Sequence, residues 1–381
     1  MLLSKGFEVE LFTGRFSGES IGLGQDIAET LPYFVCEPDN RNVQYITPPL
    51  MYYDRILGAL IEPRRLLRHY LHSLGDYTIL PGSTLSLGHT NQFYRSTPDN
   101  PYHTYIEQTY GTDVVTAGAH INIGIPDTES LLRAYRLIRL EAPLFLALSA
   151  SSPFLDDTIT GLHSTRWQLI PKTPAHVPFF SDHQHFVTWT KEQLSNGSMQ
   201  NVRHLWCSVR PSGTACPCSL NRLELRISDL VSDPLALLAI TTLLEMRILM
   251  LFNSSKSSRL DPLDPGTSKF TPDELIEITA YNEQSVAAKS LDAMVVHWQT
   301  GEWLSAREWL FTLYEQVQPL AKENNVDFWL KPILRILDEG NEAQQWLKLY
   351  AKGEMPGSIL SRAIQTVQHQ EMVLMDELVA A

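Results

Sequence analysis

Hydrophobic and polar residues alternate in several stretches that lie far apart in the chain. In the first stretch Phe7, Val9 and Leu11 share one side of the pattern, while Glu8 and Glu10 share the other. A period of two residues is typical of a β-strand with one buried face. We therefore predict strands over residues 2–12, 42–47, 116–127, 205–210 and 222–228, the third of them ending in a Gly-Ile-Pro-Asp turn.

Most of the remaining hydrophobic positions recur with a helical period. Helices are predicted over residues 50–74 with an interruption near Pro63, 126–148 with a kink at Pro143, 235–252, 272–289, 303–320, 328–337, 342–350 and 358–381. In the second of these helices Arg133, Arg136 and Arg139 are spaced by three residues, which predicts one solvated face.

The segment 235–252 is the longest apolar run, and it contains Glu245 and Arg247. Each charge costs roughly 2.5–3.5 kcal/mol at the centre of a bilayer, so a buried core helix is expected rather than a membrane span. Trp298, Trp303, Trp309 and Trp329 are also expected in the core.

Three segments are predicted as loops: the turn-rich residues 98–105, which suit a lid, the Ser/Thr/Asp-rich residues 149–168, and the surroundings of His183 and His185. A Ser/Pro/Asp-rich linker is expected near residues 256–272. It divides a catalytic α+β portion, residues 1–255, from a helical C-terminal portion, residues 273–381, packed on the same domain.

Composition limits the classes of function. The 381 residues carry a formal net charge of -13, which disfavours a broad nucleic-acid-binding surface. The N-terminal residues lack a hydrophobic core long enough for a signal peptide, so a cytoplasmic protein without a membrane span is expected. Four cysteines, at positions 36, 207, 216 and 218, fit free thiols in a reducing compartment.

Three predicted strands each present a polar face, formed by Glu8/Glu10, His120/Asn122 and Glu224/Arg226. Taken singly, each has a structural alternative: a solvent-facing edge strand, a core histidine paired with an amide, and a cross-strand ion-pair ladder with Arg222. If the three faces share one side of a sheet, they form a carboxylate-rich site suited to Mg²⁺ or Mn²⁺, with an arginine for phosphate.

Several common nucleotide and nucleophile motifs are absent from the sequence. The Gly-rich residues 14–24 match neither the P-loop nor the dinucleotide-binding pattern, and nothing suggests a Ser-His-Asp or Cys-His pair.

The chain resembles glutamate–cysteine ligases, within the branch that includes related carboxylate–amine ligases, and most closely the cyanobacterial type. The resembling segments extend over nearly the whole chain: GFEVEL (6–11), RNVQYITPP (41–49), LPGSTLSLG (80–88), AHINIG (119–124), SASSPF (149–154), GLHSTRW (161–167), NVRHLW (201–206), SVRP (208–211), NRLELRISDL (221–230) and GNEAQQWL (340–347).

The resemblance implies an α+β fold of the glutamine-synthetase type, an antiparallel, funnel-like sheet with outer helices. It implies that ATP phosphorylates the γ-carboxylate of glutamate, and that the amine of cysteine then displaces phosphate to give γ-glutamylcysteine, the first step of glutathione synthesis. By motif, the metal ligands would be Glu8, Glu10, Gln44, His120 and Glu224. The catalytic residues would be Arg226 and Asn122. Substrate or ATP would be bound by Arg166, Arg210 and Arg226.

One departure from the family pattern is Gln44, which stands where the family usually has Glu. An amide oxygen is a neutral and weaker Mg²⁺ ligand. The alternatives to a glutamate–cysteine ligase are a ligase with another amine acceptor, a metal-dependent phosphohydrolase, and a catalytically weakened homologue.

Overall fold

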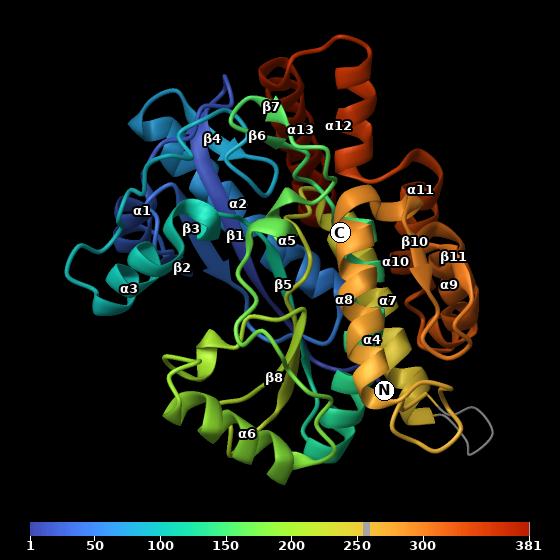
Figure 1. The fold of residues 1–381 in the computed structure, drawn as a ribbon. Helices are drawn as coiled ribbons and strands as arrows, with labels where there is room; N and C mark the ends of the chain where they lie inside the picture. Colours follow the sequence, from blue (N-terminus) through green and yellow to red (C-terminus); the bar gives the residue numbers. More distant parts are fainter. Residues whose placement is uncertain (254–259, 381) are drawn as a thin grey trace.

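The computed structural model describes residues 1–253 and 260–380, and Figure 1 shows the fold. The strands are β1 (Lys5–Arg15), β2 (Phe34–Cys36), β3 (Asn42–Ile46), β4 (Tyr77–Leu80), β5 (Ala119–Gly124), β6 (Phe154–Leu155), β7 (Thr158–Ile159), β8 (Val209–Ser212), β9 (Arg222–Leu225), β10 (Met294–Val296) and β11 (Trp303–Ser305).

The α-helices are α1 (Gly24–Thr30), α2 (Tyr53–Leu74), α3 (Pro101–Tyr110), α4 (Thr128–Ser149), α5 (Thr165–Leu169), α6 (His183–Ser195), α7 (Pro234–Asn253), α8 (Pro272–Lys289), α9 (Ala306–Glu323), α10 (Asp327–Leu330), α11 (Pro332–Glu339), α12 (Glu342–Ala351) and α13 (Pro356–Ala380). Short 3₁₀ helices cover Gly111–Val114, Val202–His204 and Ser290–Asp292.

Seven strands form one antiparallel sheet in the order β2-β3-β1-β5-β9-β8, with β4 paired to the second half of β1. The remaining strands form two separate two-stranded sheets, β6-β7 and β10-β11. Strand β1 is long enough to pair with β3, β4 and β5, so it organises the centre of the sheet.

The two faces of the large sheet differ in chemistry. Phe7, Val9 and Leu11 of β1 are at most 2% exposed and belong to the main core. Helices α2, α4 and α7 belong to this core, and the Tyr45 hydroxyl of β3 donates to the Leu60 carbonyl of α2. The other face carries the alternate, polar positions of the same strands, as the period of two predicted.

Helix α7 is the one helix among the described residues that is long and apolar enough to span a membrane, and 83% of its most apolar window is buried inside the protein. Its two charges are paired within the core: Glu245 accepts from Lys5 Nζ at 2.9 Å, and Arg247 lies 2.6 Å from a Glu141 oxygen. It is a core helix, as its charged residues predicted.

The prediction that three arginines of α4 form a solvated face is wrong for two of them. Arg136 and Arg139 are 5% and 7% exposed. Arg136 forms a buried ion pair with Asp261, and Arg139 Nη1 donates to the Tyr135 hydroxyl and the Pro178 carbonyl. Helix α4 packs against α7 and α8 and against the sheet, which covers positions that a free helix would expose.

Other local predictions also change. Pro63 and Pro143 lie inside continuous helices, α2 and α4, and the expected loop at 98–105 contains the start of α3. His183 begins α6, capped by the Asp182 side chain. Of the four tryptophans expected in the core, Trp298 and Trp309 are buried and Trp329 is half-buried, whereas Trp303 is 58% exposed on β11.

The structure describes only part of the expected linker. Residues 254–259 lie outside the described residues, and the division of the chain at 256–272 stays a prediction. Within the described part, Asp261 is buried against Arg136, which anchors this segment to α4.

Candidate active site

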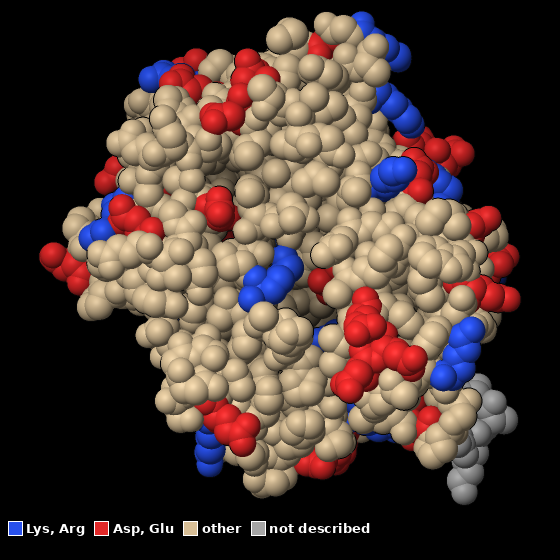
Figure 2. Space-filling view, in the orientation of Figure 1, with Lys and Arg blue, Asp and Glu red and all other residues tan. Residues whose placement is uncertain are grey.

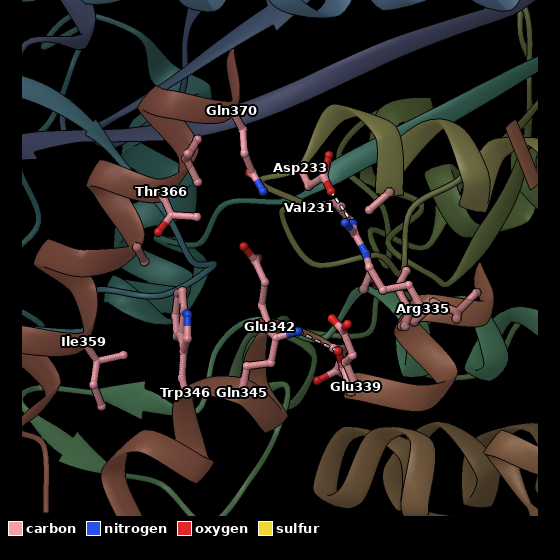
Figure 3. Close-up of a pocket in the computed structure, with 18 of the residues that line it drawn as sticks. Val231, Asp233, Arg335, Glu339, Glu342, Gln345, Trp346, Ile359, Thr366 and Gln370 are labelled. Carbon is pink, nitrogen blue, oxygen red and sulfur yellow. Dashed lines mark hydrogen bonds and ion pairs between the residues drawn. The ribbon is translucent and has the colours of Figure 1, made fainter. Parts of the chain in front are cut away.

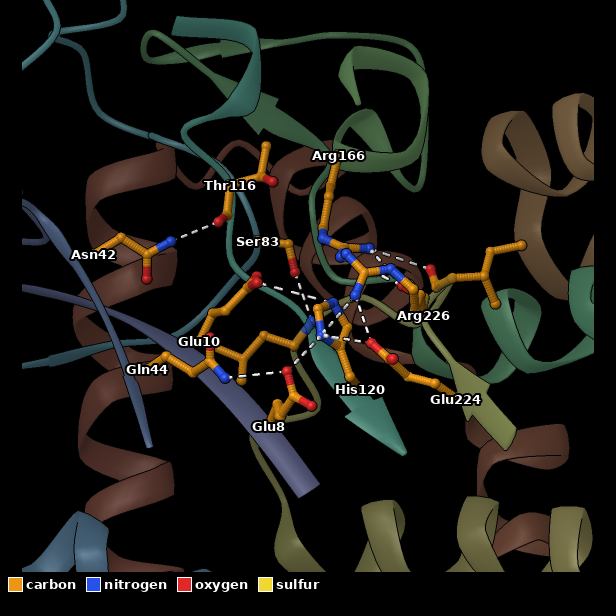
Figure 4. A network of polar contacts seen from close by, with 12 residues as sticks. Glu8, Glu10, Asn42, Gln44, Ser83, Thr116, His120, Arg166, Glu224 and Arg226 are labelled. Carbon is orange, nitrogen blue, oxygen red and sulfur yellow. Dashed lines mark hydrogen bonds and ion pairs between the residues drawn. The ribbon is translucent and has the colours of Figure 1, made fainter. Parts of the chain in front are cut away.

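Strand register brings the predicted polar residues together on one face of the sheet. Glu8 pairs with His120 across β1 and β5, and Glu10 pairs with Gln44 across β1 and β3. Glu224 of β9 pairs with Asn122 on one side and with Arg210 on the other. Figure 4 shows Glu8, Glu10, Gln44, His120, Glu224 and Arg226 pointing toward one another.

The imidazole of His120 lies at the centre of this group and is 3% exposed. Its Nδ1 is 3.9 Å from Glu8 Oε2 and 3.8 Å from Glu224 Oε1, and its Nε2 is 3.8 Å from Glu10 Oε1. One ligand atom from each of Glu8, His120 and Glu224 lies within 4.8 Å of the others, a spacing that suits a shared cation.

Two arginines surround Glu224, which is fully buried. Arg210 donates to both of its oxygens, at 2.7 and 3.1 Å, and Arg226 donates to Oε1 at 2.5 Å. Burial alone would raise the pKa of Glu224, but these two guanidiniums hold the pKa well below its usual range. The carboxylate is therefore ionised at any physiological pH.

Glu8 is held by two amides and the imidazole. The side chains of Gln44 and Asn122 donate to its two oxygens at 3.2 and 3.3 Å. Burial opposes ionisation, but the contacts with His120 outweigh it and lower the pKa of Glu8 to about 2. Gln44 thus faces the cleft as the family pattern implies, and in this structure its nitrogen is directed at Glu8.

Glu37, at the end of β2, is a cleft residue that the sequence analysis missed. It lines the same cavity as Glu8, Glu10 and His120. Burial, followed by repulsion from Glu10, raises the pKa of Glu37 to about 8. Glu8, Glu10 and Glu37 therefore place three carboxylates in the lining of one cavity. The strand β2 has only three residues, too few for an alternation pattern to reveal which of them face the cleft.

Arg166 reaches this cleft from helix α5. Its side chain is buried, its Nη atoms lie 3.3–3.5 Å from the carbonyls of Arg226 and Ile227, and its Nε has no hydrogen-bond partner among the described residues. Its Nη1 also lies 4.0 Å from Asp229 Oδ1, so Nε is the donor left for an anionic substrate. Arg210 lines the cleft but directs its donors at Glu224 and at the carbonyls of Arg203 and Leu205, so a substrate-binding role does not fit its contacts.

Gly118 offers a direct test of Arg166. A Cβ at this position would lie 2.3 Å from Arg166 Nη2, and the backbone of Gly118 is outside the left-handed region. We expect Gly118→Ala to displace the guanidinium and to lower kcat/KM roughly 10- to 100-fold, the effect of losing a charged hydrogen bond. Steady-state kinetics measure this loss of kcat/KM. Gly58→Ala is the control, because a Cβ at Gly58 would meet no atom within 4 Å. Equal activity of the two variants would contradict a role for Arg166.

Two cavities meet at Glu8. The larger, about 480 Å³, is lined by the acidic residues and by Tyr102, Arg166, Arg203 and Trp206. The smaller, about 340 Å³, is lined by Asn122, Thr47 and Arg222. Asn122 therefore lies on the far side of Glu8 from the main cleft, and its carbonyl oxygen accepts from Arg222 Nε at 3.1 Å.

The surface around the site has mixed charge. Figure 2 shows basic side chains in small separate groups on this face, with acidic side chains beside them.

All four cysteines are free thiols, and Cys36 lies beside Glu37 in the lining of the larger cavity.

Comparison with known proteins decides the family. The family model of glutamate-cysteine ligase family 2 matches residues 5–370, nearly the whole chain. The chain belongs to glutamate–cysteine ligase family 2. A relative from Rubrobacter xylanophilus, whose name marks it as a candidate glutamate–cysteine ligase 2-1, is 25% identical over 87% of this chain and 83% of its own. A relative from Salinispora tropica, also named as a candidate glutamate–cysteine ligase 2, is 22% identical over 90% of this chain and 88% of its own.

Solved structures of the same fold belong to ligases. The glutamate–cysteine ligase of Francisella tularensis, solved in complex with AMP, has a TM-score of 0.76 at 13% identity, covering 97% of this chain and 89% of that one. A bifunctional glutathione synthetase from Pasteurella multocida has a TM-score of 0.75 at 14% identity, and this chain spans 53% of its length. The predicted α+β fold with an antiparallel sheet and outer helices is confirmed, and the family supports carboxylate–amine ligase activity.

Proposed function

We propose that this protein is an ATP- and Mg²⁺-dependent glutamate–cysteine ligase that makes γ-glutamylcysteine, the first step of glutathione synthesis. The observation that carries the proposal is the convergence of Glu8, Glu10, His120 and Glu224 beside Arg226 and Arg166 on one face of the sheet. Family membership and the AMP-bound ligase of the same fold support it. The substrates are small molecules: glutamate, cysteine and ATP.

The donor set fits a hard divalent cation. Arg210 and Arg226 compensate Glu224, but among the described residues no Lys or Arg forms an ion pair with Glu8, Glu10 or Glu37. Carboxylate oxygens with one imidazole suit Mg²⁺ or Mn²⁺. The residues that would hold the metal are Glu8, Glu10, His120 and Glu224, with Gln44 as a neutral donor. The bound metal would neutralise the triphosphate during phosphoryl transfer.

The chain's own residues position and neutralise the reactants. The γ-carboxylate of glutamate attacks the terminal phosphorus of ATP and ADP leaves; the cysteine amine then attacks the acyl phosphate, loses a proton, and phosphate leaves. Arg226 and Arg166 would bind the phosphoryl and carboxylate oxygens. The two cavities on either side of Glu8 suit two substrates that react across the acidic cluster.

Measuring ATP turnover in four mixtures tests the proposal against its alternatives. Phosphate release is measured with neither amino acid, with glutamate, with cysteine and with both, and γ-glutamylcysteine is identified by mass spectrometry. We expect product and full phosphate release only with both amino acids. Release without any amino acid indicates a phosphohydrolase, and product only with another amine indicates a different acceptor. ATP binding without turnover indicates a weakened homologue.

Gln44 gives a separate test of the metal position. We expect Gln44→Glu to lower the Mg²⁺ concentration for half-maximal activity roughly tenfold, the effect of about 1.4 kcal/mol of added attraction. Without Mg²⁺ the new carboxylate repels Glu8, so the melting temperature should fall. Magnesium titrations measure the midpoint, with the exposed Gln365→Glu as control. An unchanged midpoint with a lower melting temperature would contradict a metal role for position 44.

A further inference from the structure

Another cavity, apart from the two that meet at Glu8, lies in the helical C-terminal part of the chain. It has a volume of about 290 Å³ and is enclosed by the end of α4, the start of α7, and helices α11, α12 and α13 (Figure 3). None of its lining residues lines either cavity of the proposed active site. The volume is close to the lower end of the usual range of small-molecule sites, about 300–1,000 Å³.

The wall of this cavity combines apolar and polar side chains in similar proportion. Trp346, Ile359 and Val367 form the apolar wall. Figure 3 shows the Glu342 carboxylate and the Gln370 amide pointing into the space from α12 and α13. Trp346 is 5% exposed, and neither its indole N–H nor the Gln370 amide has a hydrogen-bond partner among the described residues. These groups are therefore free to bind a ligand.

The uncompensated charge in the cavity is negative. Arg335 is held by Asp233 at 2.6 Å, and Arg362 by Glu354 at 2.8 Å. Glu342 accepts from the Ser232 hydroxyl, at 3.3 Å, and from the Ser232 backbone N–H, and it forms no ion pair with a basic residue among those described. Burial raises the pKa of Glu342 to about 7, so a bound cation would complete its ionisation.

We propose that this cavity binds a small organic cation, an ammonium group on a compact apolar body, with the ammonium on Glu342. In Figure 3 the Gln370 amide nitrogen faces the space, and rotation of this unpaired amide would let its carbonyl accept a second hydrogen bond from the ammonium. The Trp346 ring offers an aromatic face to the cation and an apolar surface to the rest of the ligand. An anionic ligand is disfavoured because the two arginines of the lining already have carboxylate partners.

Binding of n-butylammonium chloride to the full chain tests the proposal. Calorimetry and tryptophan fluorescence are recorded at pH 8 and constant chloride, with 1-butanol as the neutral analogue of similar size. We expect saturable binding of the ammonium and binding at least roughly tenfold weaker for the alcohol, because a charged hydrogen bond is lost. The absence of saturable ammonium binding would overturn the proposal.

Matched variants locate the site. We expect Glu342→Gln to weaken binding roughly tenfold or more, and Glu339→Gln, the same change at an exposed position of the rim, to leave it unchanged. Ala363→Leu fills the cavity and should abolish binding. If Glu342→Gln does not fold, Ala363→Leu is the variant that tests whether the ammonium binds in this cavity. Glu8→Gln removes a charge from the other site and should keep butylammonium binding. Loss of binding in Glu8→Gln, with retention in Ala363→Leu, would place the cation in the acidic cleft and overturn the proposal.

Discussion

Replacing Glu224 by Gln is expected to lower the turnover of the ligation at least roughly 10²–10³-fold, a loss typical of removing one preorganised charge from an active site. Glu224 is fully buried, lies 3.8 Å from His120 and is the shared partner of Arg210 and Arg226. The substitution removes a proposed metal ligand and releases two guanidiniums from their partner. Steady-state kinetics at saturating Mg²⁺ measure the loss.

Glu141→Gln is a matched control for this variant. Glu141 is also fully buried and accepts from one arginine with both oxygens, Arg247 at 2.6 and 2.8 Å, but it lies in the helical core. Both variants should lose thermal stability, because each leaves a buried arginine without its ionic partner. Only Glu224→Gln should lose turnover per folded molecule. Equal losses of turnover would show that Glu224 acts through stability alone.

The sequence predicted the polar face of the sheet because a strand alternates sides with every residue. That rule places Glu8 with Glu10, and His120 with Asn122, whatever the rest of the chain does. The rule says nothing about which strands are neighbours. The proximity of Glu10 to Gln44, and of Glu224 to Arg210, depends on the register between strands that are far apart in sequence. The resemblance to a known family grouped Glu10, Gln44 and Glu224 in one site, but it assigned Arg210 to a substrate and not to Glu224.

Residues whose environment is set by distant partners could not be predicted. The spacing of Arg136 and Arg139 is the same as that of an exposed helix face, but α8 and the residues near Asp261 cover α4. Glu37 shows the same limit, because its pKa is raised first by burial and then by repulsion from Glu10, which lies on the distant strand β1. Local pattern determines the face of a strand, whereas burial of a charge depends on which element packs against it.

Replacing the buried Lys5 is expected to have the largest effect on the stability of the fold. It occupies the hydrophobic side of β1 with Phe7 and Val9, so its side chain is directed into the core. There its Nζ lies 2.9 Å from Glu245 Oε2, and both side chains are fully buried. Glu245 also accepts from the Leu3 N–H and the Tyr53 hydroxyl. We expect Lys5→Met to lower the free energy of unfolding by about 3–5 kcal/mol, because it leaves a buried carboxylate without its cation.

A double variant separates the lost charge from the lost packing. In Lys5→Met with Glu245→Gln the pair is neutral, and the new amide oxygen can still accept from Leu3 and Tyr53. Replacing a buried ion pair by neutral groups of similar size often costs little, so the double variant should regain most of the stability lost by Lys5→Met alone. Urea unfolding curves of the wild type, both single variants and the double variant measure the coupling. If the double variant is as unstable as Lys5→Met, the loss comes from packing of the lysine stem and not from an unpaired charge.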